Sequence, residues 1–218
     1  MFVVFKKLTA INRLKRFFMK KFLWSLLALM IFAPSALAAE KVQGEVFAGM
    51  NVSNMTRFDS KVGFQVGARM EIPMKMIVNG AYINGAFALT LKGAQSDLGH
   101  ERFSSDAYYF EIPIHVGYKH YFNEKVGIFG EFGPYFAMGS FGRTGIKTDI
   151  GGMSYDTFSD IGPNGLKNFD MGLGFRVGAE IARKVPIALG YDFGIVNIAR
   201  NDYSCKNSNF YITVGYKF

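Results

Sequence analysis

The strict alternation of apolar with small or polar residues is the feature that most limits how this 218-residue chain can fold. It is clearest in residues 106–122, where Tyr108, Phe110 and Ile112 begin a long series of alternate apolar positions, and residues 167–182 repeat the scheme. A period of two residues is that of a β-strand with one apolar face. The pattern predicts eight strands, at residues 41–50, 61–73, 78–93, 106–122, 125–140, 167–182, 185–199 and 208–218.

The connections between these strands alternate in length. Short turns are expected near residues 73–77, 122–125 and 182–185, and longer polar segments near 51–60, 94–105, 141–166 and 200–207. An even number of strands with short turns at one end and long loops at the other is typical of outer-membrane barrels. The sequence therefore predicts an all-β fold, an eight-stranded antiparallel up-and-down transmembrane β-barrel with short periplasmic turns and longer extracellular loops.

The first 38 residues have the composition of an export signal. Lys20 and Lys21 precede the apolar run 22–33, Pro34 follows it, and Ala36 and Ala38 provide the small residues that a signal peptidase reads. We expect residues 1–38 to be an N-terminal extension and cleaved signal peptide, with either Met1 or Met19 as the start, and residues 39–218 to be the barrel domain.

The net charge of +8 does not indicate a nucleic-acid partner. Residues 1–38 hold seven of the 25 Lys and Arg residues and no acid, which leaves 18 basic against 17 acidic residues in the rest of the chain. The basic excess thus belongs to the expected signal peptide, and no nucleic-acid partner is predicted.

Alternation by itself does not say which face of the barrel is inside. A soluble barrel would bury the apolar face, whereas a membrane barrel turns it toward lipid. The polar face here is rich in glycine, which relieves crowding inside a narrow barrel, and it carries few charges of both signs. We therefore expect the apolar face to contact outer-membrane lipid. The interior would hold the aromatic residues Phe47, Tyr82, Tyr109, Phe129, Tyr135 and Tyr211.

The last strand ends on an aromatic residue and keeps its apolar face to the end of the chain. A terminal strand of this pattern that ends in Phe resembles the C-terminal signal by which assembly machinery recognises outer-membrane barrels, so that machinery is an expected partner. The residues of this predicted signal are Phe210, Ile212, Val214, Tyr216 and Phe218.

Several phrases occur together in a familiar order. They include YYFEIPIHVGYKHYF (108–122), FDMGLGFRVGAEI (169–181) and FYITVGYKF (210–218). In these the chain resembles the outer-membrane protein β-barrel domain family common in Bacteroidota, often labelled porin-family or PorT-like. The likeness covers residues 42–218. It implies the barrel fold and an integral outer-membrane location reached by signal-dependent export, and one branch of the family is similar to components of a protein secretion system.

A charged set shares the polar face and is predicted to form a salt-bridged network in the lumen. A hairpin centred on Lys184 would place Arg176 opposite Asp192, and one centred on Glu124 would place Lys119 diagonal to Glu131. A plug of paired charges is favoured over a catalytic pair or a proton path, because an interior of eight strands is filled by its own side chains. The set comprises Glu45, Arg69, Glu71, Glu111, Lys119, Glu131, Arg176, Glu180, Asp192 and Lys217.

No catalytic, cofactor or metal site is predicted. His100 lies near Ser104 and Ser105 in an expected external loop, which leaves a hydrolytic dyad as an alternative to a solvated histidine. His115 is expected in the lumen and His120 at the interface. The acids of loop 142–166 lack an EF-hand spacing, and this loop is the candidate surface for a protein partner. Cys205, the only cysteine, has no partner for a disulfide.

Three roles remain open. The first is a small, non-enzymatic integral outer-membrane barrel with an envelope-structural or surface-interaction role through its external loops. The second is an accessory component of a secretion system of the PorT-like kind. The third is an outer-membrane hydrolase acting on lipid or peptide. A diffusive porin is disfavoured, since open channels have 16 to 18 strands.

Overall fold

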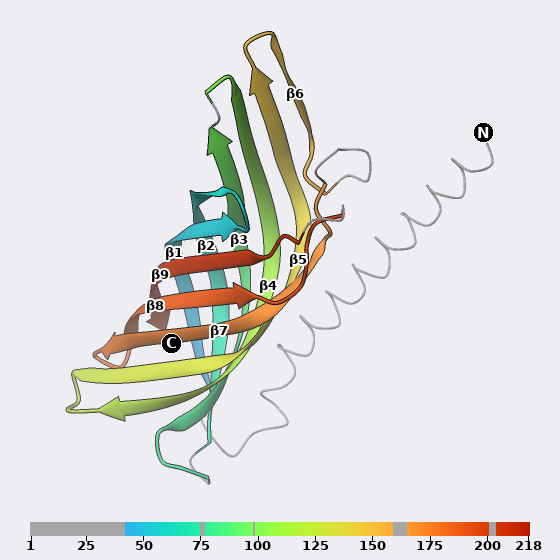
Figure 1. Cartoon of the computed structure of the whole chain (residues 1–218). Helices are drawn as coiled ribbons and strands as arrows, with labels where there is room; N and C mark the ends of the chain where they lie inside the picture. The colour runs from blue at the N-terminus through green and yellow to red at the C-terminus, as the bar shows by residue number, and fades with distance from the viewer. Residues whose placement is uncertain (1–41, 75–76, 98, 159–164, 201–203) are drawn as a thin grey trace. The chain divides into compact units, whose positions relative to one another are not determined.

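The computed structural model describes residues 42–74, 77–97, 99–158, 165–200 and 204–218. The expected signal peptide, with Ala36 and Ala38, lies outside these residues. The described chain is all-β, and no helix in it is long and apolar enough to cross a membrane. Figure 1 shows its strands, which are β1 (Gln43–Met55), β2 (Asp59–Pro73), β3 (Ala81–Asp97), β4 (Glu101–Tyr121), β5 (Val126–Thr148), β6 (Gly151–Asp156), β7 (Phe169–Ile181), β8 (Val185–Gly194) and β9 (Asn207–Lys217).

Eight of the strands form a closed antiparallel ring, which confirms the predicted strand number of the barrel. The order around the ring is β1–β2–β3–β4–β5–β7–β8–β9, and β9 returns to pair with β1. The closing register matches Val46 with Tyr216 and Val52 with Phe210. Beyond the last ladder pair, Phe218 N–H donates to the Gly44 carbonyl at 2.9 Å, so pairing continues to the final residue.

Short turns join the strands at one end of the barrel, called here the turn end. Residues 122–125 form one of them, where the Asn123 side-chain oxygen accepts from the amides of Lys125 and Val126 at 2.8 and 2.9 Å. Residues 182–184 form another, in which Ala182 and Arg183 have φ of 51° and 58°. Positive φ at both central positions defines the type I′ turn that suits the twist of paired strands. The third connection is longer than predicted and spans residues 74–80.

The opposite end, called the hairpin end, differs from the prediction of long irregular loops. The predicted loops 51–60 and 94–105 are wrong: β1 and β2 leave only residues 56–58 between them, and β3 and β4 leave only 98–100. Their pairing continues outward through polar residues, with Gln95 opposite Ser104 and Asp97 opposite Arg102. The ladder persists because backbone hydrogen bonds hold it whether the side chains are apolar or not.

The predicted loop 142–166 is also largely strand. β5 runs on to Thr148 and folds back as β6, which pairs with it from Arg143–Asp156 to Thr148–Gly151. β6 belongs to no part of the ring, and the β3–β4 and β5–β6 hairpins project together beyond the other strands (Figure 1). Conversely, β8 ends at Gly194 instead of continuing to residue 199 as predicted.

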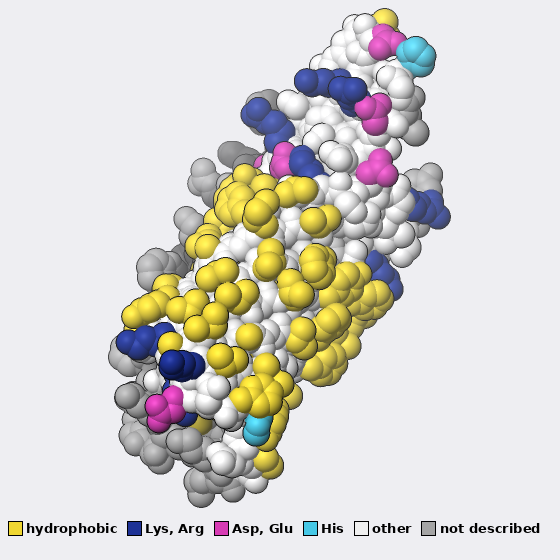
Figure 2. Space-filling model, turned by 90° about the vertical axis from the view of Figure 1, so that its left-hand side faces the viewer, with side chains coloured by type: hydrophobic (Ala, Val, Ile, Leu, Met, Phe, Trp, Pro, Cys, Tyr) yellow, Lys and Arg dark blue, Asp and Glu magenta, His cyan; other side chains and the backbone are white. Residues whose placement is uncertain are grey.

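The two faces of the ring follow the predicted alternation. Outward side chains are apolar and exposed, and they form the yellow belt visible on one side of the barrel in Figure 2, with charged residues toward both ends. The predicted interior aromatics are all buried: Phe47, Tyr82, Tyr109, Phe129, Tyr135 and Tyr211. The predicted assembly-signal residues all face outward and are exposed, and their role as a signal stays a prediction: Phe210, Ile212, Val214, Tyr216 and Phe218.

Interior aromatic rings lie directly opposite glycines on the neighbouring strand. Each ring covers its glycine so closely that a Cβ atom there would collide with it; on Gly178, for example, the Cβ would lie 2.7 Å from the Phe129 ring. Aromatic–glycine pairs of this kind fix the register of a curved sheet. The matched pairs are Phe47–Gly67, Tyr82–Gly117, Tyr121–Gly127, Phe129–Gly178, Tyr135–Gly172 and Tyr211–Gly190.

Gly178→Val is expected to lower the free energy of unfolding of the barrel by about 1–3 kcal/mol, the usual cost of overpacking. The added side chain would meet both the Phe129 ring and the Ile187 carbonyl oxygen. The measurement is the urea midpoint of the heat-modifiable band on a gel. Gly85→Val is the control, because nothing lies within 4 Å of a Cβ at that strand position. Equal midpoints for the two variants would contradict this account of the glycines.

Candidate functional site

At the turn end, two lysines and two glutamates form a closed ring of alternating charge inside the barrel. Lys119 lies 2.8 Å from Glu71 and 2.8 Å from Glu180, and Lys217 lies 2.6 Å from each of the same two carboxylates. The four residues come from β2, β4, β7 and β9, so the ring connects walls that are not neighbours in the sheet. Tyr121 also donates its hydroxyl to Glu180. We call this set the Lys–Glu ring.

Above the ring, two arginines and two glutamates form a chain across the lumen, called here the arginine chain. Arg69 donates to Glu45 at 2.7 Å, and Arg176 lies 3.5 Å from Glu45 and 2.9 Å from Glu131. All four side chains are buried. The Arg176 guanidinium also stacks over the Phe129 ring at 4.7 Å, which fixes its position.

Glu131 is the most heavily bonded acid of the arginine chain. Tyr82 and Asn84 donate to it at 2.9 and 2.8 Å, and His115 Nδ1 lies 3.7 Å away. Four groups from three other strands thus surround one carboxylate, which is what a buried charge needs to remain in a folded protein. This arrangement joins the strands that carry these groups, because both oxygens of Glu131 accept hydrogen bonds from other strands.

Toward the hairpin end, the lumen holds more acids than bases. Lys92 pairs with Glu111, which also accepts from Thr90 at 2.6 Å. Asp170 accepts from the Asn207 amide at 2.9 Å, and Asp192 accepts from the Asn209 amide at 3.4 Å. Neutral amides therefore take the place of cations around these two carboxylates.

The structure places all ten residues of the predicted charge set inside the barrel, but not in every predicted pairing. The expected contact of Arg176 with Asp192 is wrong, because the hairpin centres on Arg183 and sets Arg176 opposite Gly190. The hairpin centred on Glu124 is confirmed by the pairing of Lys119 with Phe129. Lys119 nevertheless reaches across the lumen to Glu71 and Glu180 instead of diagonally to Glu131.

Sequence reasoning missed two charged residues of the interior, Lys92 and Asp170, both fully buried. Each shares the inward parity of its strand, Lys92 with Thr90 and Asp170 with Gly172, so strict parity would have found them. The amides that serve Asp170 and Asp192 have no sequence signal, because an asparagine on a polar face is compatible with water as well.

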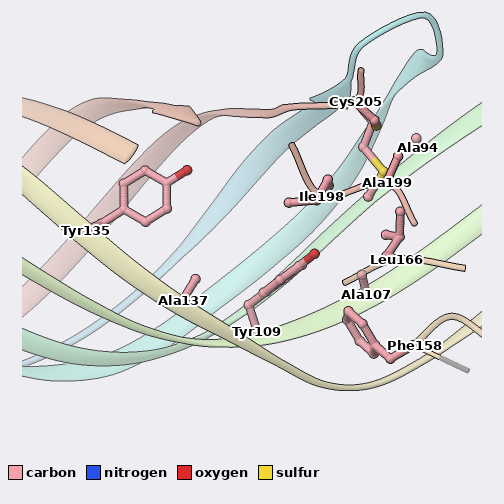
Figure 3. Close-up of a cluster of buried hydrophobic side chains, with 11 residues drawn as sticks. Ala94, Ala107, Tyr109, Tyr135, Ala137, Phe158, Leu166, Ile198, Ala199 and Cys205 are labelled. Carbon is pink, nitrogen blue, oxygen red and sulfur yellow. The ribbon is translucent and has the colours of Figure 1, made fainter. Parts of the chain in front are cut away.

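The mouth of the barrel, its opening at the hairpin end, is closed by residues that fold inward from two parts of the chain: 165–168 in the first, and 195–200 with 204–206 in the second. We call their described residues the cap. Their apolar side chains pack on residues of β1, β3, β4 and β5 in one cluster, shown in Figure 3. Its members are Met55, Ala94, Ala107, Tyr109, Tyr135, Ala137, Phe158, Leu166, Ile198, Ala199 and Cys205.

Hydrogen bonds hold the cap together, both within its second segment and between the two segments. Ile198 N–H donates to the Cys205 carbonyl at 2.8 Å, and the Asn197 side-chain oxygen accepts from the Cys205 amide at 2.8 Å. Arg200 joins the two segments by donating to the Leu166 carbonyl at 2.8 Å. Residues 195–199, which the sequence predicted as the end of a strand, therefore belong to the cap that closes the mouth.

The histidines do not assemble a hydrolytic site with the serines near them in sequence. His100 Nδ1 lies 2.5 Å from Asp149, and both side chains are exposed at the tips of the two projecting hairpins. Ser104 accepts from Lys61 at 2.7 Å, and Ser105 bonds to Thr144 at 2.9 Å. His100 thus links the β3–β4 and β5–β6 hairpins.

The other two histidines, His115 and His120, lie apart from the projecting hairpins. His115 is buried in the lumen beside Glu131, and His120 is exposed with its ring 5.1 Å from that of Phe122. Of the acids in segment 142–166, Asp149 pairs with His100, Asp156 accepts from the Phe158 amide at 2.9 Å, and residue 160 lies outside the described residues. Within the described ranges, no group of three or more metal-ligating side chains could hold an ion.

Arg176→Leu is expected to destabilise the barrel by about 3–5 kcal/mol, because Glu131 and Glu45 would lose a buried cation. The measurement is the urea midpoint of the folded band in detergent. The double variant Arg176→Leu/Glu131→Gln is the control, since it removes both charges of the closest pair and should recover part of the loss. Wild-type stability of the single variant would show that the arginine chain does not hold the fold.

Comparison with known proteins gives a family and a set of distant structural likenesses. The model of the outer membrane protein beta-barrel domain matches residues 24–218. Ail, the attachment invasion locus protein of Yersinia pestis, is 17% identical with a TM-score of 0.43, over 82% of this chain and 100% of its own. No curated protein matches the sequence.

Two further solved structures resemble the chain at a similar level. Neisserial surface protein A is 14% identical with a TM-score of 0.46, over 81% of this chain and 97% of its own. The outer membrane protein OprG of Pseudomonas aeruginosa is 11% identical with a TM-score of 0.47, over 81% and 95%. Values this low transfer no role to the present chain.

Proposed function

The chain belongs to the outer membrane protein beta-barrel domain family, and from that premise we propose that it is a closed, non-enzymatic barrel that spans the bacterial outer membrane and acts at the cell surface through its projecting hairpins. The observation that carries the proposal is the contrast between a lumen filled by paired charges and two hairpins that extend beyond the barrel. The first leaves no path for a solute, and the second offers surface for a partner.

The apolar belt supports membrane spanning. On β1, β7 and β9 most outward positions are apolar and exposed, whereas charged side chains of the same strands point inward. Exposing so much apolar surface to water would cost about 25 cal/mol per Å². Lipid removes that cost, and ring closure leaves no unpaired strand edge within the bilayer. The outward apolar residues of these three strands include Val46, Met50, Val52, Phe169, Leu173, Phe175, Val177, Ile212 and Val214.

The projecting hairpins differ from the belt in composition and exposure. Their tips carry ion pairs, such as Arg102 with Asp97 at 2.8 Å, and one apolar residue, Ile150, that is 99% exposed. Water-exposed charges at both faces of a hairpin are incompatible with burial in lipid. We infer that the hairpin end lies outside the cell and that segment 142–166 is the surface for a protein partner.

The other two roles have weaker support. A hydrolase would need a nucleophile beside His100, but the serines near it in sequence are bonded to Lys61 and Thr144. Membership of a PorT-like branch stays a prediction from the sequence, and deletion of the gene would test it through the loss of secreted proteins. The outer-membrane location follows from the family, and signal-peptide cleavage after Ala38 stays a prediction.

Cysteine labelling on intact cells tests the proposed topology. In a Cys205→Ser background, Ile150→Cys at the hairpin tip is expected to react with a membrane-impermeant maleimide. Lys184→Cys at the turn end is the matched control, because its side chain is also exposed and should react only after permeabilisation. Labelling of Lys184→Cys on intact cells, with Ile150→Cys protected, would reverse the orientation and remove the hairpins from the surface.

Shortening the β5–β6 hairpin tests the surface role. Deletion of residues 145–154 with an Asn-Gly turn in their place removes the projection and should leave the folded barrel intact, because the ring does not include β6. We expect the heat-modifiable band to persist while binding of cells to surfaces or partner proteins falls. A partner-binding profile unchanged by the deletion would contradict a role for this hairpin.

A further inference from the structure

A cavity of about 230 Å³ lies beside the cap at the mouth of the barrel. Its walls come from the β1–β2 connection, from β4 and from both cap segments. Met55, Phe58, Phe103, Leu166, Ala199 and Cys205 supply most of the lining. No residue of the Lys–Glu ring or of the arginine chain is among the lining residues, so this cavity is distinct from those two charged sets of the lumen.

The lining is mostly apolar, and the polar side chains at its border are Thr56, Arg57, Ser105 and Ser204. Two of these direct their hydrogen bonds elsewhere: Ser105 bonds to Thr144 at 2.9 Å, and Thr56 donates to the Lys206 carbonyl at 3.3 Å. The Leu166 amide donates to the Thr157 carbonyl at 2.8 Å. Because these groups already have hydrogen-bond partners, they do not need a water molecule inside the cavity. An apolar cavity of this kind stays dry or takes an apolar guest.

The walls are formed before any guest arrives. Phe58 and Phe103 stack with their ring centroids 4.8 Å apart, and the bridge between Leu166 and Ala199 joins the two cap segments. Both rings are half-buried, so the wall that they form reaches the surface of the protein. A preformed apolar site loses little conformational entropy when it is filled.

The volume sets the size of the guest. An engineered apolar cavity of about 150 Å³ binds benzene, which corresponds to roughly 25 Å³ for each carbon atom. At that ratio the present cavity has room for about nine carbon atoms. A membrane acyl chain is longer than this, whereas a single aromatic ring with a short substituent fits.

We propose that the capped mouth binds one small, free apolar molecule of the size of a substituted benzene, between the Phe58–Phe103 pair and the wall formed by Leu166, Ala199 and Cys205. This site goes beyond the surface role of the hairpins and does not depend on it. It would give the protein a ligand drawn from outside the barrel, held at the mouth, with no passage through the plugged lumen.

Cys205 provides a reporter inside the proposed site, because it is the only cysteine of the chain and lies in the cavity wall. Burial raises the pKa of its thiol, so it should react slowly with maleimides near neutral pH and faster as the pH rises. The test measures the rate of N-ethylmaleimide reaction with the full protein in lipid nanodiscs while toluene is added. We expect toluene to slow the reaction at Cys205 severalfold, with saturation.

Two variants separate a filled cavity from other effects. Ala199→Leu fills the cavity from its wall and should abolish the protection by toluene; if it does not fold, Ser204→Leu fills the cavity from an exposed position. Ile150→Cys in a Cys205→Ser background is the matched control, because its thiol lies outside the cavity and should react at a rate independent of toluene.

The proposal is overturned if toluene gives no saturable protection, if it protects the Ile150→Cys thiol equally, or if a folded filling variant keeps the protection. Should Cys205 not react at all in the folded protein, the readout becomes the temperature at which the folded gel band is lost. Toluene must then raise that temperature in the wild type and leave it unchanged in the filling variant. No rise in the wild type would likewise overturn the site.

Discussion

Closure of the ring by β1 and β9 is the constraint from which the rest of the structure follows. Eleven residue pairs join the two strands, and the backbone bond from Phe218 to Gly44 extends the seam to the end of the chain. A closed ring leaves no unpaired edge, which is the condition for a sheet in lipid. It also fixes a narrow interior, because the width of a barrel is set by its number of strands.

That narrow interior explains the two kinds of residue found in it. Large rings are accommodated only where the facing residue is glycine, as in the pairs Tyr211–Gly190 and Phe129–Gly178. Deep in the lumen, charges are accommodated where opposite charges meet: the Lys–Glu ring and the arginine chain are each balanced, two cations against two anions. Near the mouth the balance ends, and asparagine amides serve the acids there. The lumen thus acts as a core, and contact with other molecules is left to the hairpins and the mouth.

The sequence predicted the central part of the strands well and their outer parts poorly. Within the apolar belt, alternation is imposed by two different surroundings, so residues such as Ile112 and Glu111 reveal their faces directly. Beyond the belt both faces of a hairpin meet water, and segments such as 95–97 lose the alternation while keeping their backbone pairing. The apolar run 195–199 gave the opposite error. Its residues were predicted as strand, but Ile198 and Ala199 are buried in the cap and not in the sheet.

The sequence by itself determined the all-β class, the ring of eight strands, the inward charge set and the outward apolar face, since each depends on a period of two residues that can be read locally. Only the tertiary structure decided which charges meet, that β5 and β6 form a projecting hairpin, and that the chain after β8 closes the mouth around a cavity. Those features depend on strand register and on contacts between residues as distant as Lys217 and Glu71. A shift of one position in a single hairpin, as between Lys184 and Arg183, moves every cross-strand partner, and no local pattern encodes it.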